Sequence, residues 1–322
     1  MDIFWNIINI LNIIFILFVV FFERKEDSQR MSWLLTLIFL PGVGMILYIL
    51  LSGHFFTQKP QLKRINQYSS KLNEQFITKQ LSFFQKEKES FNNKFFHDNH
   101  HLINMNLSHG KSLLTVTDSI KIYRWGQDLF ADLKQDLEAA TESIFIESFI
   151  FHNDTIGTEI MDILCRKAKQ GLTVKLLYDD MGSITTRTKF FERLDKAGGT
   201  SLTFSPIRCR LPLTINFRNH RKNTIIDGKI GYMGGVNIGD EYANQSKNKR
   251  KPLWRDTHIR ITGDSVLFMQ KIFLIDWFTT PAWKTRLRKL EDITKYFPES
   301  IFDGIKEKIS PENDTNFSLN IF

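Results

Sequence analysis

The chain has 322 residues, enough for two ordinary domains. Its formal net charge is +8, and Lys and Arg are spread along the whole sequence, which favours an anionic partner such as a lipid surface or a phosphate-bearing substrate. Only two cysteines occur, Cys165 and Cys209, and this number argues against a disulfide framework and against a cysteine metal site.

Two long uncharged runs, at about residues 3–22 and 32–51, dominate the N-terminal part. Each is long enough to cross a bilayer as a helix. The first lacks the positive charge and the cleavage site of a signal peptide. Because the spacer 23–30 is short, we predict a transmembrane hairpin over residues 1–56, with the N-terminus and the rest of the chain on the same side of the cell membrane. Three basic residues lie in the hairpin loop and three follow the second run, so the positive-inside count is nearly tied, and we only slightly favour a cytoplasmic catalytic half.

Polar and helix-breaking residues lie inside the two runs. Asn6, Asn9 and Asn12 recur every three residues and therefore lie near one face of the first helix. In lipid, such amides form hydrogen bonds with another helix. Pro41 and Gly42 lie in the middle of the second run, where a kink is tolerated. We expect these residues to pack the hairpin together, and contact with a second copy of the chain is the alternative.

Residues 57–110 are rich in Lys, Gln and Asn, and we interpret them as a polar linker of one or two surface helices. The linker contains the sequence FHDNHH at Phe96–His101. Clustered histidines without a defined ligand geometry are weak evidence for a metal site. We therefore expect a solvated polar segment there, and no metal and no cofactor in the protein.

From residue 111 to about residue 300, helical and strand patterns alternate, and several helices end at glycine, which is typical of an α/β domain. Residues 301–322 form a divergent C-terminal tail. We expect a β-hairpin over 112–125, helices over 127–140, 158–170, 186–197 and 264–278, and strands over 143–151, 173–178, 201–204, 223–226 and 257–261.

The stretch NHRKNTIIDGKIGYMGGVN, Asn219–Asn237, is the strongest candidate for chemistry. His220 and Lys222 are two residues apart, so on an extended chain their side chains point to the same face. An imidazole can attack phosphorus while an ammonium group holds the phosphate oxygens. Asp227 has the opposite parity, which favours an orienting or structural role over direct sharing of a substrate with His220.

The end of the same stretch supplies the remaining parts of a phosphate site. Gly234 and Gly235 remove side chains where the backbone must come close to another group. Asn237 offers an amide donor for an oxygen. Together these residues predict a phosphate site that contains its own nucleophile and requires no metal.

The spacing His-x-Lys-x4-Asp-x6-Gly-Gly-x-Asn resembles the signature of the phospholipase D superfamily, and the surrounding segments resemble bacterial cardiolipin synthases. These segments are FLPGVGMILYILLSG, LLYDDMGS, RNHRK, IDGKIGYMGGVNIGDEY and WRDTHIRITG. The resemblance implies a mixed sheet flanked by helices, which is one half of the usual two-half enzyme. It implies that His220, Lys222, Asp227 and Asn237 form half of an active site.

The reaction implied by the resemblance joins two phosphatidylglycerols into cardiolipin through a phosphatidyl-histidine intermediate and releases glycerol. The implied partners are anionic phospholipid and the membrane. Some positions depart from the family pattern: Phe145, Ser148 and Phe149 stand where relatives often have a histidine and tyrosines. Asp256 and His258 match a family segment, but the alternation around them favours structural roles.

Enzymes of this family carry two copies of the motif, because one histidine attacks phosphorus and the other protonates the leaving oxygen. Here His109-Gly110-Lys111 is the only other His-x-Lys, and it lacks the Asp and the glycine pair. We therefore expect half of an enzyme, with the second motif supplied by a second copy of the chain or by a full-length relative.

Two alternatives stay open at this point. One is a dimeric phosphodiesterase or nuclease, and the other is a catalytically silent protein that binds anionic lipid or a full-length relative. Because the predicted hairpin keeps the chain at a bilayer, a phospholipid is a more accessible phosphodiester substrate than nucleic acid, and we expect no nucleic-acid partner.

Overall fold

The computed structural model describes residues 2–22, 27–51, 77–78, 80–82, 94–110, 114–204, 218–245, 253–280, 296 and 317–319. The chain divides into two compact units, one of residues 1–58 and 205–218 and one of residues 59–204 and 219–322. Each unit has its own hydrophobic core. Cys209 and most of the residues in the predicted linker and tail lie outside the described part.

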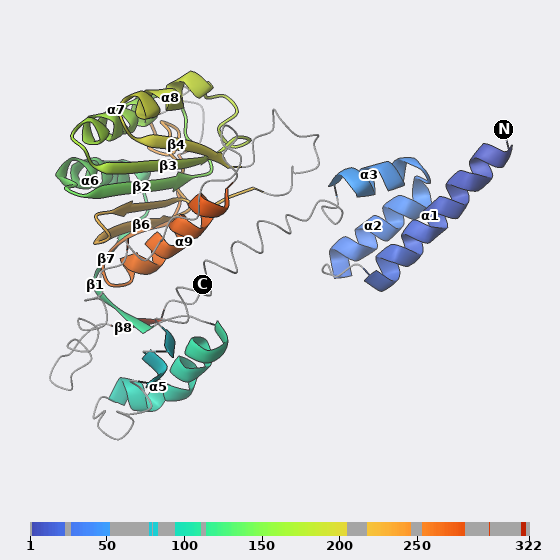
Figure 1. Cartoon of the computed structure of the whole chain (residues 1–322), viewed down its shortest axis with the longest axis horizontal. Helices are drawn as coiled ribbons and strands as arrows, with labels where there is room; N and C mark the ends of the chain where they lie inside the picture. The colour runs from blue at the N-terminus through green and yellow to red at the C-terminus, as the bar shows by residue number, and fades with distance from the viewer. Residues whose placement is uncertain are drawn as a thin grey trace. The chain divides into compact units, whose positions relative to one another are not determined.

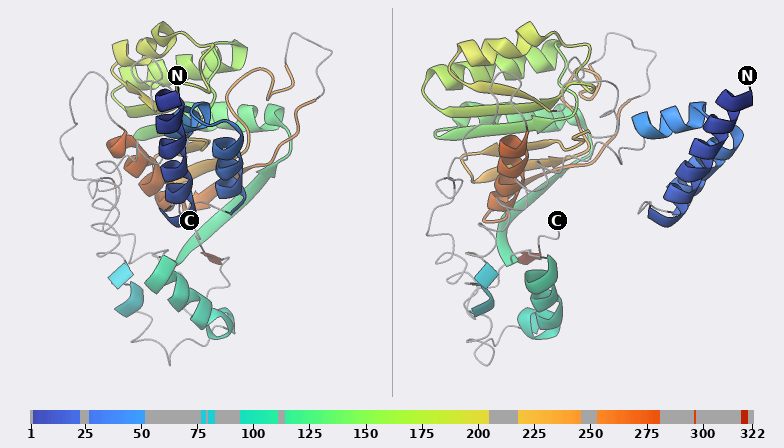
Figure 2. Two further views of the ribbon diagram at one scale, coloured as in Figure 1. Left: turned by 90° about the vertical axis from the view of Figure 1, so that its right-hand side faces the viewer. Right: turned by 45° about the vertical axis from the view of Figure 1, so that its right-hand side comes forward.

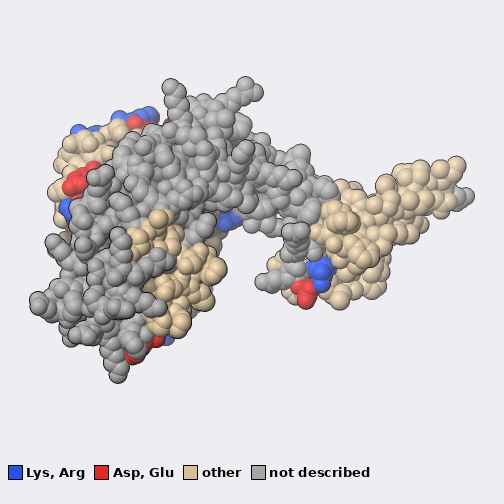
Figure 3. Space-filling model, turned by 60° about the horizontal axis from the view of Figure 1, so that its bottom comes forward, with Lys and Arg blue, Asp and Glu red and all other residues tan. Residues whose placement is uncertain are grey.

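The first unit contains three helices, α1 (Asp2–Phe22), α2 (Asp27–Phe39) and α3 (Val43–Leu51) (Figure 1). Within the described ranges, Ile3–Phe22 is the one helical segment long and apolar enough to cross a membrane. The visible surface of these helices is almost free of charged side chains (Figure 3). The second uncharged run forms two helices instead of the expected single one, because Pro41 lacks an N–H group and Gly42 has a φ of 85°.

A hydrogen bond between α1 and α2 compensates for this break. Asn12 Nδ2 donates to the backbone oxygen of Leu37 at 2.9 Å, and both residues are buried. In an unbroken helix that oxygen would accept from the N–H of residue 41, which is Pro41. Asn12 therefore supplies the missing donor, as expected for an amide at a helix–helix contact. Asn6 and Asn9 are exposed.

In the second unit the strands form one sheet in the order β4-β3-β2-β5-β6-β7-β1-β8. β2, β3 and β4 are parallel, whereas β5, β6, β7 and β1 pair in antiparallel fashion, so the sheet is mixed. The strands are β1 (Leu114–Tyr123), β2 (Ser143–Ser148), β3 (Thr173–Asp179), β4 (Thr200–Phe204), β5 (Asn223–Ile226), β6 (Ile230–Gly234), β7 (His258–Gly263) and β8 (Phe317–Leu319). The predicted α/β class with a mixed sheet is confirmed.

Helices cover both faces of this sheet (Figure 2). The helices of the second unit are α5 (Lys94–Met105), the π-helical turn η1 (Asn106–Gly110), α6 (Gly126–Ala139), α7 (Thr155–Lys169), α8 (Thr188–Lys196) and α9 (Val266–Thr279). Alternate residues of β2 point to opposite faces, so that Ile144 and Ile146 pack with α6, α7 and α8, whereas Phe145 stacks on Phe273 of α9.

Two local predictions are wrong. The hairpin expected over 112–125 does not form, because Leu114–Tyr123 is one continuous strand, with a register shift between Thr117 and Ser119. The segment 230–234, absent from the expected strands, forms β6. Its glycines weaken the strand pattern, but a side chain at Gly231 would collide with Met269 of α9.

The contact between Asn12 and Leu37 generates a prediction about the first unit. Asn12→Leu should destabilise the packing of α1 on α2 by about 1 kcal/mol, the scale of an interhelical hydrogen bond in a membrane protein. Pro41→Ala should remove most of this penalty, because Ala supplies the N–H that Leu37 lacks. Hydrogen exchange of the α2 amides in micelles measures both effects. Asn9→Leu, at an exposed position, is the control, and an equal loss in the Pro41→Ala background would contradict the explanation.

Candidate active site

His220 and Lys222 lie together where the extended segment 218–222 enters β5. Lys222 Nζ lies 3.1 Å from His220 Nδ1 and donates to the backbone oxygen of His220 at 2.6 Å. His220 is exposed, whereas Lys222 is only 6% exposed. The structure thus places an accessible imidazole against a buried cation, on one face of the chain, as the two-residue spacing predicted.

An aromatic ring completes the immediate surroundings of this pair. The ring of Phe149, just after β2, packs on the ring of His220 with a centroid distance of 4.5 Å. The ammonium group of Lys222 lies 5.4 Å from the centre of the same ring. Phe149 therefore restricts the imidazole and covers the lysine, although the sequence singled it out only as a departure from the family pattern.

The surroundings lower the pKa of both groups. The slight burial of the imidazole and the positive charge of Lys222 lower the pKa of His220, against the opposing effect of Asp179. Burial lowers the pKa of Lys222 to about 8, although the carboxylate of Asp256 opposes it. At neutral pH His220 is therefore mainly neutral, so that one ring nitrogen has a free electron pair for attack on phosphorus.

Asn237 follows β6, whose end pairs with the start of β5, the strand that His220 and Lys222 precede. Its Oδ1 accepts from the backbone N–H of Ile150 at 3.2 Å, next to Phe149, and the Tyr242 hydroxyl is another hydrogen-bond partner. Asn237 is buried, and its contacts fix the segment that follows β2. A donor role toward substrate phosphate stays a prediction.

The glycine pair brings a second segment close to the site. A side chain at Gly234 would collide with the backbone of Thr257, and one at Gly235 would collide with the carboxylate of Asp256. The Gly235 N–H donates to Thr257 O at 3.0 Å. These glycines thus give Asp256 its position near Lys222, and their direct contact with phosphate stays a prediction.

His258, at the start of β7, is buried, and burial lowers its pKa to about 4. Its imidazole packs beside Gly234 and lacks the exposed face that His220 presents. These contacts agree with the structural role expected for His258.

Asp227 lies at the opposite end of β5 from His220. The backbone of Asp227 has a φ of 52°. Its carboxylate accepts four hydrogen bonds of 2.8–2.9 Å, from Thr141 N, Thr141 Oγ1, Glu142 N and Ser143 N. Although burial favours the neutral acid, these hydrogen bonds lower the pKa of Asp227. Asp227 therefore fastens the β5–β6 turn to the start of β2 and does not meet the histidine.

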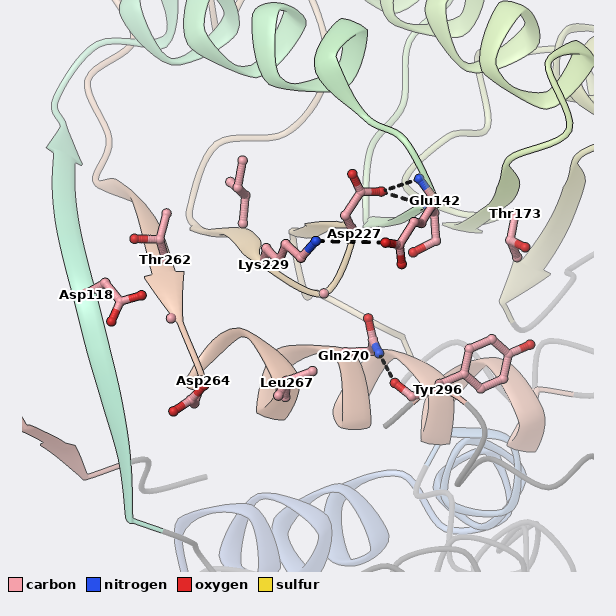
Figure 4. A pocket seen from close by; sticks show the side chains of 14 residues that line it. Asp118, Glu142, Thr173, Asp227, Lys229, Thr262, Asp264, Leu267, Gln270 and Tyr296 are labelled. Atoms are coloured by element: carbon pink, nitrogen blue, oxygen red, sulfur yellow. Dashed lines mark hydrogen bonds and ion pairs between the residues drawn. The ribbon is translucent and has the colours of Figure 1, made fainter. Parts of the chain in front are cut away.

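A cavity of about 890 Å³ opens at this far end of the sheet (Figure 4). Asp227, Lys229, Gln270 and Tyr296 are among the residues that line it, and none of His220, Lys222 and Asn237 does. The cavity is thus separate from the candidate phosphate site, and the structure divides the predicted set of site residues between two ends of β5.

Sequence reasoning missed several polar residues behind the site. Asp179 is 1% exposed and accepts from Met181 N at 2.8 Å, Gly182 N at 3.1 Å and Asn219 N at 3.3 Å. Glu147 is 2% exposed in β2 and accepts from the side chain of Asn219. Acidic residues inside apolar strands were the signal that could have found them. Among the described residues, no group of three or more metal-binding side chains occurs.

Comparison with known proteins connects this geometry to a family. Residues 133–249 match the family described as cardiolipin synthase, PLD-like domain, and residues 10–53 match the family described as phospholipase D-nuclease N-terminal. The chain is 41% identical over 256 residues to cardiolipin synthase of Staphylococcus aureus strain Mu50. It is 38% identical over 278 residues to the major cardiolipin synthase of Bacillus subtilis strain 168.

The chain contains a PLD-like domain of the cardiolipin synthase family, at residues 133–249. The matches cover 79% and 86% of this chain but 51% and 56% of the two relatives, so the chain spans about half the length of the curated relatives it matches. Among solved structures, the chain is similar to phosphatidylserine synthase of Haemophilus influenzae, with a TM-score of 0.42 and 15% identity over 69% of this chain and 49% of that one. It is also similar to the phospholipase D family member Nuc of Salmonella typhimurium, with a TM-score of 0.39 and 17% identity over 52% of this chain and 99% of that one.

The contacts of Asp227 predict a loss of stability on substitution. Asp227→Ala should lower the free energy of unfolding by about 2 kcal/mol or more at pH 7, because hydrogen bonds to a charged group are lost. Asp227→Asn keeps one acceptor oxygen and tolerates the positive φ, so its loss should be smaller.

The pH dependence checks the cause. Because the pKa of Asp227 is lowered in the folded protein, its contribution is present above its unfolded pKa of about 3.9 and disappears as the pH falls through the lower folded value. Denaturant unfolding of the full chain at several pH values measures the difference. Unchanged stability together with lost turnover would instead assign Asp227 to the chemistry.

Proposed function

We propose that this chain supplies half of a phosphatidyltransferase site that converts two phosphatidylglycerols into cardiolipin and glycerol. A ring nitrogen of His220 bonds to the phosphorus of the first lipid, and the bond from phosphorus to the glycerol headgroup oxygen breaks. The headgroup hydroxyl of the second lipid then attacks the phosphatidyl-histidine, which frees the imidazole. The observation that carries the proposal is the exposed His220 in contact with the buried Lys222.

Each partner of His220 has a role in this proposal. The ammonium group of Lys222 stabilises the charge that develops on the phosphate oxygens, and burial makes this interaction stronger than in water. Phe149 holds the imidazole plane, and Asn237 orders the neighbouring backbone. The amide of Asn237 and the glycine pair remain candidates for direct phosphate contact.

The leaving glycerol oxygen requires a proton, and the sequence contains one His-x-Lys-x4-Asp motif. We infer that a second histidine from outside these 322 residues, supplied by another copy of the chain or by a full-length relative, acts as the general acid for the leaving glycerol and then accepts the proton of the attacking hydroxyl. Activity of these residues by themselves then requires association.

The substrate is an anionic phospholipid, and we propose that residues 1–56 keep the chain in the membrane as two spans, with the catalytic half on the cytoplasmic side. The apolar helix Ile3–Phe22 and the uncharged surface around it support the attachment to a membrane. Release of the intact chain by a carbonate wash would contradict it.

The function is tested by the conversion of phosphatidylglycerol in mixed micelles at decreasing protein density. If two histidines must meet, the rate per chain should fall on dilution. His220→Ala should reduce turnover to background and abolish the covalent phosphatidyl-protein adduct, since no other described residue has this geometry. His109→Ala removes the histidine of the other His-x-Lys and should leave both unchanged.

The other outcomes separate the alternatives. A rate per chain that does not fall on dilution would contradict the requirement for a second motif. Release of phosphatidic acid without cardiolipin would indicate a phosphodiesterase. Lipid binding without any adduct, with or without a full-length relative, would indicate a catalytically silent protein.

The lowered pKa values predict the pH dependence of kcat/KM. Because Lys222 must be charged, kcat/KM should fall as the pH rises through about 8, and because His220 must be neutral, it should fall at acidic pH below the ordinary histidine range. Lys222→Arg keeps the charge and should move the alkaline fall to higher pH, whereas Lys222→Ala should cost about a hundredfold at every pH. An alkaline limb that Lys222→Arg leaves in place would belong to the general-acid histidine of the second motif, and it would contradict the assignment of that limb to Lys222.

A further inference from the structure

The segment that carries the two catalytic residues has a second, opposite face. On an extended chain the odd-numbered residues Asn219, Arg221 and Asn223 point away from the even-numbered ones. All three odd-numbered side chains end on two carboxyl groups, those of Glu147 in β2 and Asp276 in α9. The reactive face of the segment therefore depends on how its rear face is held.

Asn219 links the two carboxyl groups through its side-chain NH2 group. Its Nδ2 donates to Glu147 Oε1 and to Asp276 Oδ2, the latter at 3.3 Å. Its Oδ1 accepts from the backbone N–H of Arg221 at 3.0 Å. The residue directly before His220 is thus fixed to β2, to α9 and to its own chain.

The two carboxyl groups differ in their environment. Glu147 is fully buried, and burial together with the negative charge of Asp276 raises its pKa well above the ordinary range, so that it is held as a neutral acid in the sheet. Asp276 reaches the edge of the core, where it forms an ion pair with Arg221, whose side chain is half exposed. Asp276 can therefore be changed with less damage to the core than Glu147.

We propose that Asp276 is a positioning residue, which acts through Asn219 and Arg221 to keep His220 and Lys222 turned toward the substrate phosphate. It contacts neither the two catalytic side chains nor substrate. The inference rests on the proposed function for its effect on turnover, but the placement it describes is measurable without turnover.

The pKa of His220 reports that placement. Burial lowers this pKa most, and the positive charge of Lys222, whose Nζ lies 3.1 Å from His220 Nδ1, lowers it further, while Asp179 of β3 opposes both effects. If Asp276→Ala releases the segment, the Lys222 contact weakens and the pKa of His220 rises toward about 6.5. Loss of the negative charge alone would have the opposite sign, because it favours the neutral imidazole.

The experiment compares Asp276→Ala with Asp276→Asn in the full-length chain in micelles. The chain is labelled with ¹³C-histidine, and the His220 signal is identified from its loss in His220→Ala. Asp276→Asn keeps an acceptor for Asn219, so the pKa of His220 should stay low, whereas Asp276→Ala should raise it. Arg221→Ala breaks the ion pair with Asp276 from the side of the exposed arginine and should also raise the pKa of His220. Asp162→Ala breaks a more exposed ion pair with Arg193, between two surface helices, and is the control for the loss of an Arg–Asp pair.

Turnover gives a second, separate readout. Asp276→Ala should lower kcat by about tenfold to a hundredfold with little change in KM, since a small displacement of reacting groups has that effect. Asp276→Asn should retain most of the activity. An unchanged pKa of His220 in both Asp276→Ala and Arg221→Ala, or equal losses of kcat in the Asn and Ala variants, would overturn the positioning role. The expected pKa changes without any turnover in the wild type would instead contradict the proposed function alone.

Discussion

Two-residue alternation in one extended segment is the constraint on which the site depends. Because the side chains of an extended chain alternate between two faces, the segment before β5 presents His220 and Lys222 on one side and Asn219 and Arg221 on the other. The reactive face needs freedom to meet a lipid phosphate, whereas the rear face is packed on β2 and α9. The sheet and α9 thus position the side chains of His220 and Lys222, which lie just before β5.

The site also shows how ionisable groups are accommodated in a core. Burying a charge is costly unless hydrogen bonds or an opposite charge accompany it, or the group becomes neutral. Glu147 is held neutral, and Asp227 is held charged by four hydrogen bonds. Burial lowers the pKa of Lys222, and the negative charge of Asp256 partly offsets this effect. The three groups sit within or beside the same pair of strands, yet their environments assign them different charge states and different roles.

The N-terminal helices follow the same physical rule in a different setting. Pro41, just after the end of α2, has no N–H group, which would leave the carbonyl oxygen of Leu37 without its helical partner in an apolar environment. Asn12 of α1 satisfies that oxygen, so a helix break and a polar residue, each unfavourable alone, form one contact. A pair of this kind specifies which faces of α1 and α2 meet.

The sequence by itself determined the α/β class, most of the helices and strands, and the proximity of His220 to Lys222, because these depend on periodicity and on spacing within one segment. It did not determine that Leu114–Tyr123 is a single strand or that Ile230–Gly234 is one, since strand pairing with distant partners decides both. Only the tertiary structure separated Asp227 from His220 and joined Asn219 to Glu147 and Asp276, which lie 72 and 57 residues away along the chain. The physical reason is that parity predicts the direction of a side chain, whereas its partner depends on which strand and helix the fold places opposite it.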